Sequence, residues 1–302
     1  MKLPTWLEYL LGLRQRPRYV TSPGTPNQPG RVRCVELKDG DSLWQGERNY
    51  LRRLGERYYE FFDPRTDRTK PAPVVMLLHG RGGNAAQARY SFQFEAEAER
   101  RGWVVIYPGG QRQGRLGGWD FNLAWNDGTG KDDPPLDDVK FLTDVLWDFK
   151  QCYMRYTHLC VGGHSNGSAM AFRYAMSDEG YMVYCLAGNA GAIAPEAGSR
   201  QTPCIYFHGV QDPVVSHGMC MDIAQRWGAH NGAVSSGVCH EIGDSECELW
   251  IDDDFPVYIW SISPGGHSIP GGKAGPHERF AEPVNQDVSW AEEVGKFSAR
   301  FV

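Results

Sequence analysis

One serine lies in a sequence context typical of a nucleophile. Residues 161–172, VGGHSNGSAMAF, indicate the end of a strand, a tight turn and the first turns of a helix, with Ser165 at the apex. Such a turn holds a hydroxyl out above the edge of a sheet, where a base can remove its proton. Gly163 and Gly167 suit this turn because strand and helix approach each other closely there. The pattern predicts a nucleophilic serine, and an incidental serine in a glycine-rich turn is the alternative.

A carboxylate and a histidine are expected beyond two later strands, because in proteins with this turn they follow the serine along the chain. The segment IYFHGVQDPVV puts Asp212 just past a strand, whereas Asp222 lies within a predicted helix and residues 252–254 in a polar run. The segment VYIWSISPGGHSIPGG puts His267 in a glycine-rich loop after the last strand. We expect Asp212 to accept the Nδ1 proton of His267, and His267 to act as the base for Ser165. A capping or turn role is the alternative for Asp212.

Two backbone N–H groups are expected to stabilise the oxyanion of an acyl-transfer reaction. One belongs to Asn166, the residue after the nucleophile. The other belongs to the HGRGGN loop after the VVMLLHG strand, from Arg81 or, as the alternative, Gly82. This loop lacks the lysine and hydroxyl residue of a phosphate-binding loop. His79 and His208, each before a glycine at a strand end, are interpreted as supports of the site's floor.

Predicted strands and helices alternate along most of the chain. This alternation is typical of right-handed crossovers, and it predicts an α/β fold with a mostly parallel sheet and helices on both faces. A Pro- and Gly-rich stretch, TSPGTPNQPG, closes an N-terminal arm or linker of residues 1–30, and residues 31–302 are expected to form a single catalytic domain. The expected strands span residues 57–62, 73–80, 103–108, 158–163, 182–191, 204–209 and 257–262, and the expected helices span 84–102, 137–153, 166–176, 217–230 and 288–301.

Charge and hydropathy narrow the range of partners. The formal net charge is -6, with acids and bases interspersed and no long basic run, so a nucleic-acid partner is not expected. No stretch reaches the roughly 18 apolar residues that a membrane-spanning helix requires. The first residues, MKLPTWLEYLLGLRQRPRY, predict a short amphipathic helix, with a degenerate export signal or a surface anchor as the alternative. The default expectation is a cytoplasmic protein.

The cysteines do not indicate a disulfide-rich scaffold, since there are 8 in 302 residues, and no C-x-x-C pair suggests zinc. Cys239 and Cys247 flank HEIGDSE, a segment with turn residues, and are either a local disulfide in an oxidising compartment or two free thiols. Cys160, Cys185 and Cys204 fall in apolar runs and are expected to be small buried residues.

Six segments occur in an order and context shared with one known group of enzymes. They are LLHGRGGN, WNDG, DDVKFLTDVLWDFKQCYMRY, GGHSNGSAMAFRYA, FHGVQDPVV and GGHSIPG. Together they resemble the polyhydroxybutyrate depolymerase-like and feruloyl esterase group of α/β-hydrolases, over roughly residues 55–302. The resemblance implies the α/β-hydrolase fold and a serine carboxylesterase that needs no metal or organic cofactor. Many members of the group are exported, which makes secretion the alternative to a cytoplasmic location.

The resemblance also implies a role for each candidate site residue. Ser165, Asp212 and His267 correspond to the catalytic triad, and Arg81 and Asn166 to the oxyanion positions. The expected partner is a small-molecule or polymeric ester.

A long loop, residues 109–135, leaves the carboxyl end of a strand and should border the site. Trp119 and Trp125 are the candidate substrate-binding residues of this loop, together with His164 beside the serine. With Phe121, the two tryptophans form either an aromatic wall for an acyl group or a small core within the loop. An aromatic wall suits a feruloyl, another aryl or a hydroxyalkanoate ester, without distinguishing among them.

The expected reaction is acylation of Ser165 by an ester, followed by hydrolysis of the acyl-enzyme by water that His267 activates. An acyltransferase or a peptidase with the same triad is one alternative, and a peptidase would also cleave aryl amides. A catalytically inactive homologue that binds a carbohydrate or lipid ester is the other. In that case a fluorophosphonate probe would not label Ser165.

Overall fold

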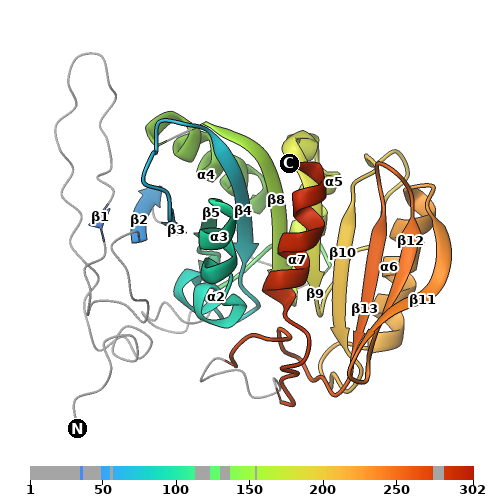
Figure 1. Ribbon diagram of the computed structural model, residues 1–302. Coiled ribbons are helices and arrows are strands. Elements are labelled where there is room, and N and C mark those ends of the chain that lie inside the picture. Colours follow the sequence, from blue (N-terminus) through green and yellow to red (C-terminus); the bar gives the residue numbers. More distant parts are fainter. Residues whose placement is uncertain are drawn as a thin grey trace, which may run out of the picture.

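The computed structural model describes residues 35–36, 49–54, 57–112, 123–129, 137–153, 155–274 and 282–302. The predicted arm of residues 1–30, with its amphipathic helix, lies outside the described residues. An 11-stranded sheet runs through the described part, in the order β1-β2-β3-β5-β4-β8-β9-β10-β13-β12-β11 (Figure 1). Its strands are β1 (Val35–Glu36), β2 (Asn49–Leu54), β3 (Arg57–Phe62), β4 (Ala72–Leu78), β5 (Val104–Pro108), β8 (Tyr156–His164), β9 (Val183–Asn189), β10 (Cys204–Gly209), β11 (Val234–Ile242), β12 (Ser245–Ile251) and β13 (Val257–Ile262).

The centre of the sheet is parallel and its edges are antiparallel. Each neighbouring pair from β5 through β4, β8, β9 and β10 to β13 is parallel. Antiparallel strands extend the sheet on both sides, and a separate ribbon pairs β6 (Gln111–Arg112) with β7 (Leu123–Ala124). The central strands are runs of Val, Ile, Leu and Met, because helices cover both of their faces. The predicted mostly parallel sheet is confirmed.

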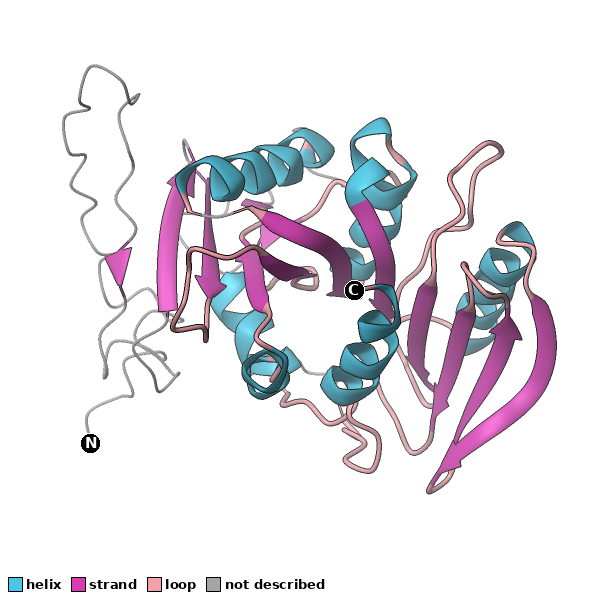
Figure 2. Ribbon diagram, turned by 45° about the horizontal axis from the view of Figure 1, so that its top comes forward, coloured by secondary structure: helices cyan, strands magenta, loops and turns pink. Residues whose placement is uncertain are grey.

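Helices pack on both faces of the sheet (Figures 1 and 2). Successive side chains of β4 alternate between two cores, as the two-residue period of a strand requires. Met76 faces the core under α4, α5 and α6, whereas Leu77 faces the core under α2, α3 and α7. The helices are α2 (Ala85–Phe92), α3 (Glu95–Arg101), α4 (Asp138–Cys152), α5 (Asn166–Met176), α6 (His217–His230) and α7 (Trp290–Ser298), with short 3-10 helices η1 (Asp178–Met182) and η2 (Ala299–Phe301).

The helix predicted over residues 84–102 is wrong as a single element, because the chain breaks between α2 and α3. Gln93 ends α2 in the left-handed region, at φ 51°, and its side-chain amide donates to Tyr90 O at 2.6 Å. The prediction also omitted the hairpin of β11 and β12, whose turn contains Gly243 at φ 59°. No helix in the described part of the chain has the length and apolar character needed to cross a bilayer.

Backbone atoms lie in direct contact where β8 joins α5. A Cβ on Gly163 would collide with the carbonyl of Gly167, and a Cβ on Gly167 would collide with the carbonyls of Leu78 and His79 at the end of β4. Only glycine allows this close approach of two strands and a helix.

Replacing Gly167 with alanine should therefore lower the free energy of unfolding by several kcal/mol, on the order of 3, because backbone atoms must move apart. Gly218→Ala is the matched control, since no atom lies within 4 Å of a Cβ at this helical position. The control should be neutral or stabilising by up to about 1 kcal/mol. Chemical denaturation of both variants checks this, and an equal stability of the two variants would contradict the packing argument.

Candidate active site

Ser165 occupies the strained turn between β8 and α5. Its backbone has φ 55° and ψ -125°, a conformation that costs a non-glycine residue roughly 1–3 kcal/mol. The turn is held on both sides, since Ser165 N–H donates to Asn189 O at 2.8 Å and Ser165 O accepts from Ala169 N–H at 3.0 Å. Its side chain does not cap α5, so the hydroxyl is not used by the helix that it precedes. The predicted strand, turn and helix around this serine are present.

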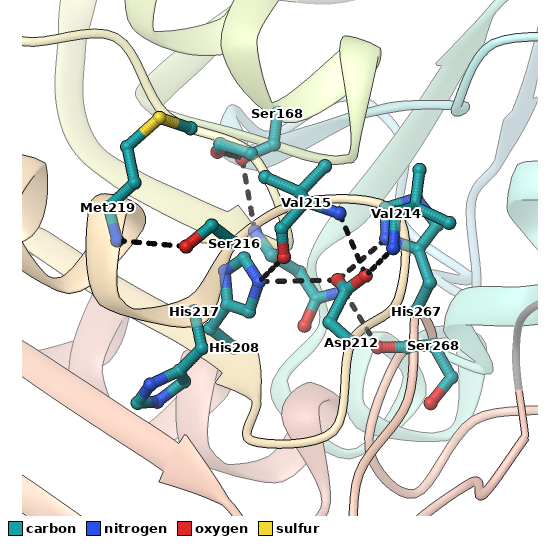
Figure 3. A network of polar contacts seen from close by, with 12 residues as sticks. Ser168, His208, Asp212, Val214, Val215, Ser216, His217, Met219, His267 and Ser268 are labelled. Carbon is teal, nitrogen blue, oxygen red and sulfur yellow. Dashed lines mark hydrogen bonds and ion pairs between the residues drawn. The ribbon is translucent and has the colours of Figure 1, made fainter.

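Asp212 and His267 form a hydrogen-bonded pair. Asp212 lies in the turn after β10, and its Oδ2 accepts from His267 Nδ1 at 2.7 Å. Its Oδ1 accepts from the backbone N–H groups of Val214, at 2.8 Å, and Val215, at 3.0 Å (Figure 3). Burial by itself raises the pKa of Asp212, but the hydrogen bonds from His208, His267 and Val215 outweigh burial and hold this pKa far below its usual range. The carboxyl group is therefore ionised and oriented.

The structure brings this pair to the serine turn through His164. The rings of His164 and His267 lie 4.7 Å apart between centroids, and His164 immediately precedes Ser165. Ser165 Oγ and His267 Nε2 both belong to the described residues, and no hydrogen bond joins these two atoms. The structure thus joins Asp212 to His267 and packs the His267 ring against His164, the residue before Ser165.

Asn189, at the end of β9, connects the serine turn to the histidine loop. Its Nδ2 donates to His164 Nδ1 at 2.7 Å and to Ser268 O at 2.9 Å. Its backbone O accepts from Ser165, and its backbone N–H donates to Ser168 Oγ at 3.1 Å. The side chain is fully buried. The sequence analysis missed Asn189, although its place at the carboxyl end of a central strand was an available signal.

His79 organises the loop expected to supply an oxyanion donor. Its Nδ1 lies 2.8 Å from Gly80 O, and its Nε2 accepts from Gly110 N–H at 2.9 Å. Burial is the main cause that lowers the pKa of His79 to about 4, so the ring is neutral and fits one donor and one acceptor role. Gly82 N–H donates to Leu123 O at 2.8 Å. That bond engages the N–H of Gly82, the alternative donor of this loop.

The side chain of Asn166 holds a second segment beside the site. Its Oδ1 accepts from Trp125 N–H at 2.8 Å, and its Nδ2 donates to Trp125 O at 3.0 Å. The N–H of Asn166 is at the first position of α5, where backbone donors have no partner within the helix. The side chain of Asn166 is therefore engaged with Trp125, while its backbone N–H lies outside the hydrogen bonds of the helix.

The substrate-binding role expected for Trp125 needs correction. Its side chain is fully buried, and its indole N–H donates to His79 O at 2.8 Å. Trp125 thus belongs to the core beneath the loop and is not part of a substrate surface. His164 is likewise buried, and its contacts assign it to the support of His267. Trp119 and Phe121 lie outside the described residues.

Cys239 and Cys247 are free thiols and do not form the local disulfide that was the other possibility. Cys239 is exposed, whereas Cys247 is buried, and neither forms a disulfide. The strand register places His240 opposite Cys247, so the two cysteines are not a cross-strand pair. Cys160, Cys185 and Cys204 are buried, as predicted. Among the residues that the structure describes, no group of three or more His, Cys, Asp or Glu side chains is arranged to hold a metal ion.

Comparison with known sequences finds a similar protein among the esterases. Feruloyl esterase B of Talaromyces funiculosus is 24% identical over 173 residues, which cover 54% of this chain and 44% of the relative. The chain thus spans less than half the length of the curated relative that it matches. No protein-family model matches the sequence.

Solved structures define the fold. The acetyl xylan esterase of Aspergillus awamori is similar with a TM-score of 0.53 at 14% identity, over 71% of this chain and 90% of that chain. The S-formylglutathione hydrolase of Agrobacterium tumefaciens gives a TM-score of 0.50 at 15% identity, over 59% of this chain and 81% of that chain. The chain has the α/β-hydrolase fold, as predicted. The predicted resemblance to a feruloyl esterase-like group of α/β-hydrolases is confirmed as well.

Replacing Asn189 with alanine should slow the reaction of Ser165 with a fluorophosphonate probe by about 10- to 100-fold. The physical reason is that the amide connects the serine turn to the loop of His267, and small displacements of reacting groups are costly. The measurement is the labelling rate at saturating and at limiting probe, which separates reactivity from binding.

Asn231→Ala is the matched control. Asn231 is also buried, and its Nδ2 donates to two backbone carbonyls, Thr202 O at 2.8 Å and Phe255 O at 3.0 Å. Both variants should lose about 1–3 kcal/mol of stability. Only Asn189→Ala should lose reactivity, and equal labelling rates of the two variants would refute the connecting role.

Proposed function

We propose that this protein is a serine carboxylesterase, with Ser165 as nucleophile, His267 as general base and Asp212 as the acid that orients His267. The observation that carries this proposal is the hydrogen-bonded pair of Asp212 and His267, with the His267 ring packed on His164, the residue before the strained Ser165. A strained conformation at a non-glycine residue persists where the surrounding structure enforces it, which is common at active sites. The similarity to a feruloyl esterase supports the same activity.

In the proposed mechanism, His267 Nε2 takes the proton of Ser165 as Oγ attacks the ester carbonyl carbon. Asp212 stabilises the imidazolium that forms, because its carboxylate already accepts the Nδ1 proton. The N–H groups of Asn166 and Arg81 stabilise the oxyanion. The protonated histidine then gives its proton to the departing alcohol, and the acyl group remains on Oγ. Water activated by the same ring releases the acid and restores the serine.

The proposed substrates are esters with an apolar group, of the aryl, short acyl or hydroxyalkanoate class, either as small molecules or as polyesters. Val210 and Val214 flank the acid turn, with exposed fractions of 47% and 49%. These valines present apolar surface near Asp212, which suits an aryl or alkyl group more than a charged one. The name of the feruloyl esterase relative supports the aryl members of this class.

The test is hydrolysis of p-nitrophenyl esters of increasing chain length and of methyl ferulate. Ser165→Ala should lower kcat/KM by about a thousandfold or more, because the nucleophile is removed. Ser177→Ala is the matched control, since Ser177 lies at the other end of α5 and donates to Tyr174 O. Retained activity in Ser165→Ala would contradict the proposal, and so would cleavage of aryl amides as fast as esters, which indicates a peptidase. An absence of fluorophosphonate labelling in the wild type would indicate an inactive homologue.

A further inference from the structure

The carboxylate of Asp212 has a second histidine partner, His208 at the end of β10. His208 Nε2 lies 3.2 Å from the same Oδ2 that accepts from His267 Nδ1 (Figure 3). The side chains of Asp212 and His208 are both completely buried, whereas 13% of the His267 side chain is exposed. Asp212 therefore lies between two imidazoles, of which only one reaches the surface.

Hydrogen bonds fix the orientation of His208. Its Nε2 lies near two acceptors, the carboxylate of Asp212 and the carbonyl of Val215 at 3.0 Å, so this nitrogen carries a hydrogen. Its Nδ1 lies 2.9 Å from the hydroxyl of Tyr206. A hydroxyl both donates and accepts, so Nδ1 has a partner whether or not it is protonated. The surroundings thus accommodate the cationic ring as well as the neutral one.

Charge balance distinguishes the two forms. In the part of the chain that the structure describes, no Lys or Arg forms an ion pair with Asp212, and the side chains that pair with its carboxylate within 4.0 Å are the two histidines. A buried carboxylate is stable when a cation compensates it. If His267 carried that proton at rest, it would be unable to act as the base for Ser165.

We propose that His208 is a positioning residue that carries the resting positive charge opposite Asp212 and so leaves His267 neutral. The inference rests on the proposed function, because it concerns the base of that same site. Without the His208 cation, the carboxylate would stabilise a protonated His267 more strongly. His208 thus keeps His267 neutral, and able to act as a base, at lower pH than Asp212 alone would allow.

The groups around His208 agree with this assignment. Its own strand contributes Tyr206, α6 contributes His217 and Cys220, and the serine turn and the last loop contribute His164 and His267. Asp212 is the acidic residue among these neighbours. The ring of His217 lies 5.7 Å from His208 between centroids, but its Nε2 contacts Ser261 Oγ at 3.1 Å.

The pKa of His208 is shifted in the direction that a resting cation requires. Burial by itself lowers the pKa of His208, but the hydrogen bond to Asp212 and further partners outweigh burial and raise this pKa to about 9. A histidine titrates near 6.5 when it is unperturbed. A raised value means that His208 keeps its proton through neutral pH and loses it only in the alkaline range.

The experiment compares wild type with His208→Gln, whose amide retains a neutral donor near the position of Nε2. The rate of fluorophosphonate labelling of Ser165 is measured as a function of pH. The acidic limb of the profile should move to higher pH by between about one and three units, as expected for the loss of a neighbouring cation. His217→Gln is the matched control and should leave the limb in place. An unchanged limb in His208→Gln would overturn the proposal.

Side-chain nitrogen NMR of wild-type protein with labelled histidine gives an independent answer that needs neither activity nor a folded variant. At neutral pH the two ring nitrogens of His208 should have the similar shifts of a cation, and widely separated shifts of a neutral ring would overturn the proposal. If the probe labels no serine while the NMR shows the cation, the proposed function fails and the charge assignment stands. If the probe labels Ser165 while the NMR shows a neutral His208, the proposed function stands and the charge assignment fails.

Discussion

The close approach of β8 and α5 to β4 is the constraint on which the rest of the site depends. Glycine at 163 and 167 lets a strand, a helix and a second strand touch through their backbones, and the connecting residue is forced to a positive φ. That residue is Ser165. The packing of a large sheet with a core on each face offsets the backbone strain of Ser165. Without that packing, the turn would relax to an unstrained conformation. The strained serine is thus a consequence of the whole fold.

The parallel centre of the sheet explains why distant residues meet. Carboxyl ends of parallel strands lie along one edge, so His79 after β4, Asn189 at the end of β9 and His208 at the end of β10 all come close to the serine turn. Each is buried and each has a hydrogen-bonding partner in a loop. The loops that carry Asp212 and His267 are therefore attached to rigid strand ends, although they lie at the surface.

The sequence predicted the elements with strong local signals and missed those without. Ser165 had a glycine-flanked turn, and the central strands had continuous apolar runs that helices cover on both faces. The break at Gln93 had no such signal, because a glutamine in the left-handed region is stabilised by its surroundings and not by its own preference. The role of Asn189 was hidden for a related reason. A lone asparagine at a strand end does not reveal that its amide will join another strand end to a loop 104 residues away, from His164 to Ser268.

The histidines of the site show how one residue type acquires different proton states from its surroundings. Burial lowers the pKa of His79 to about 4 and that of His164 well below its ordinary value, and both rings serve as neutral hydrogen-bonding groups. His208 is buried as deeply, but a carboxylate lies beside it, and its pKa rises to about 9. The difference is the one ionised acid, Asp212, which stabilises a cation where burial alone would expel one. A single buried charge thus separates the histidines that stay neutral from His208, which holds its proton.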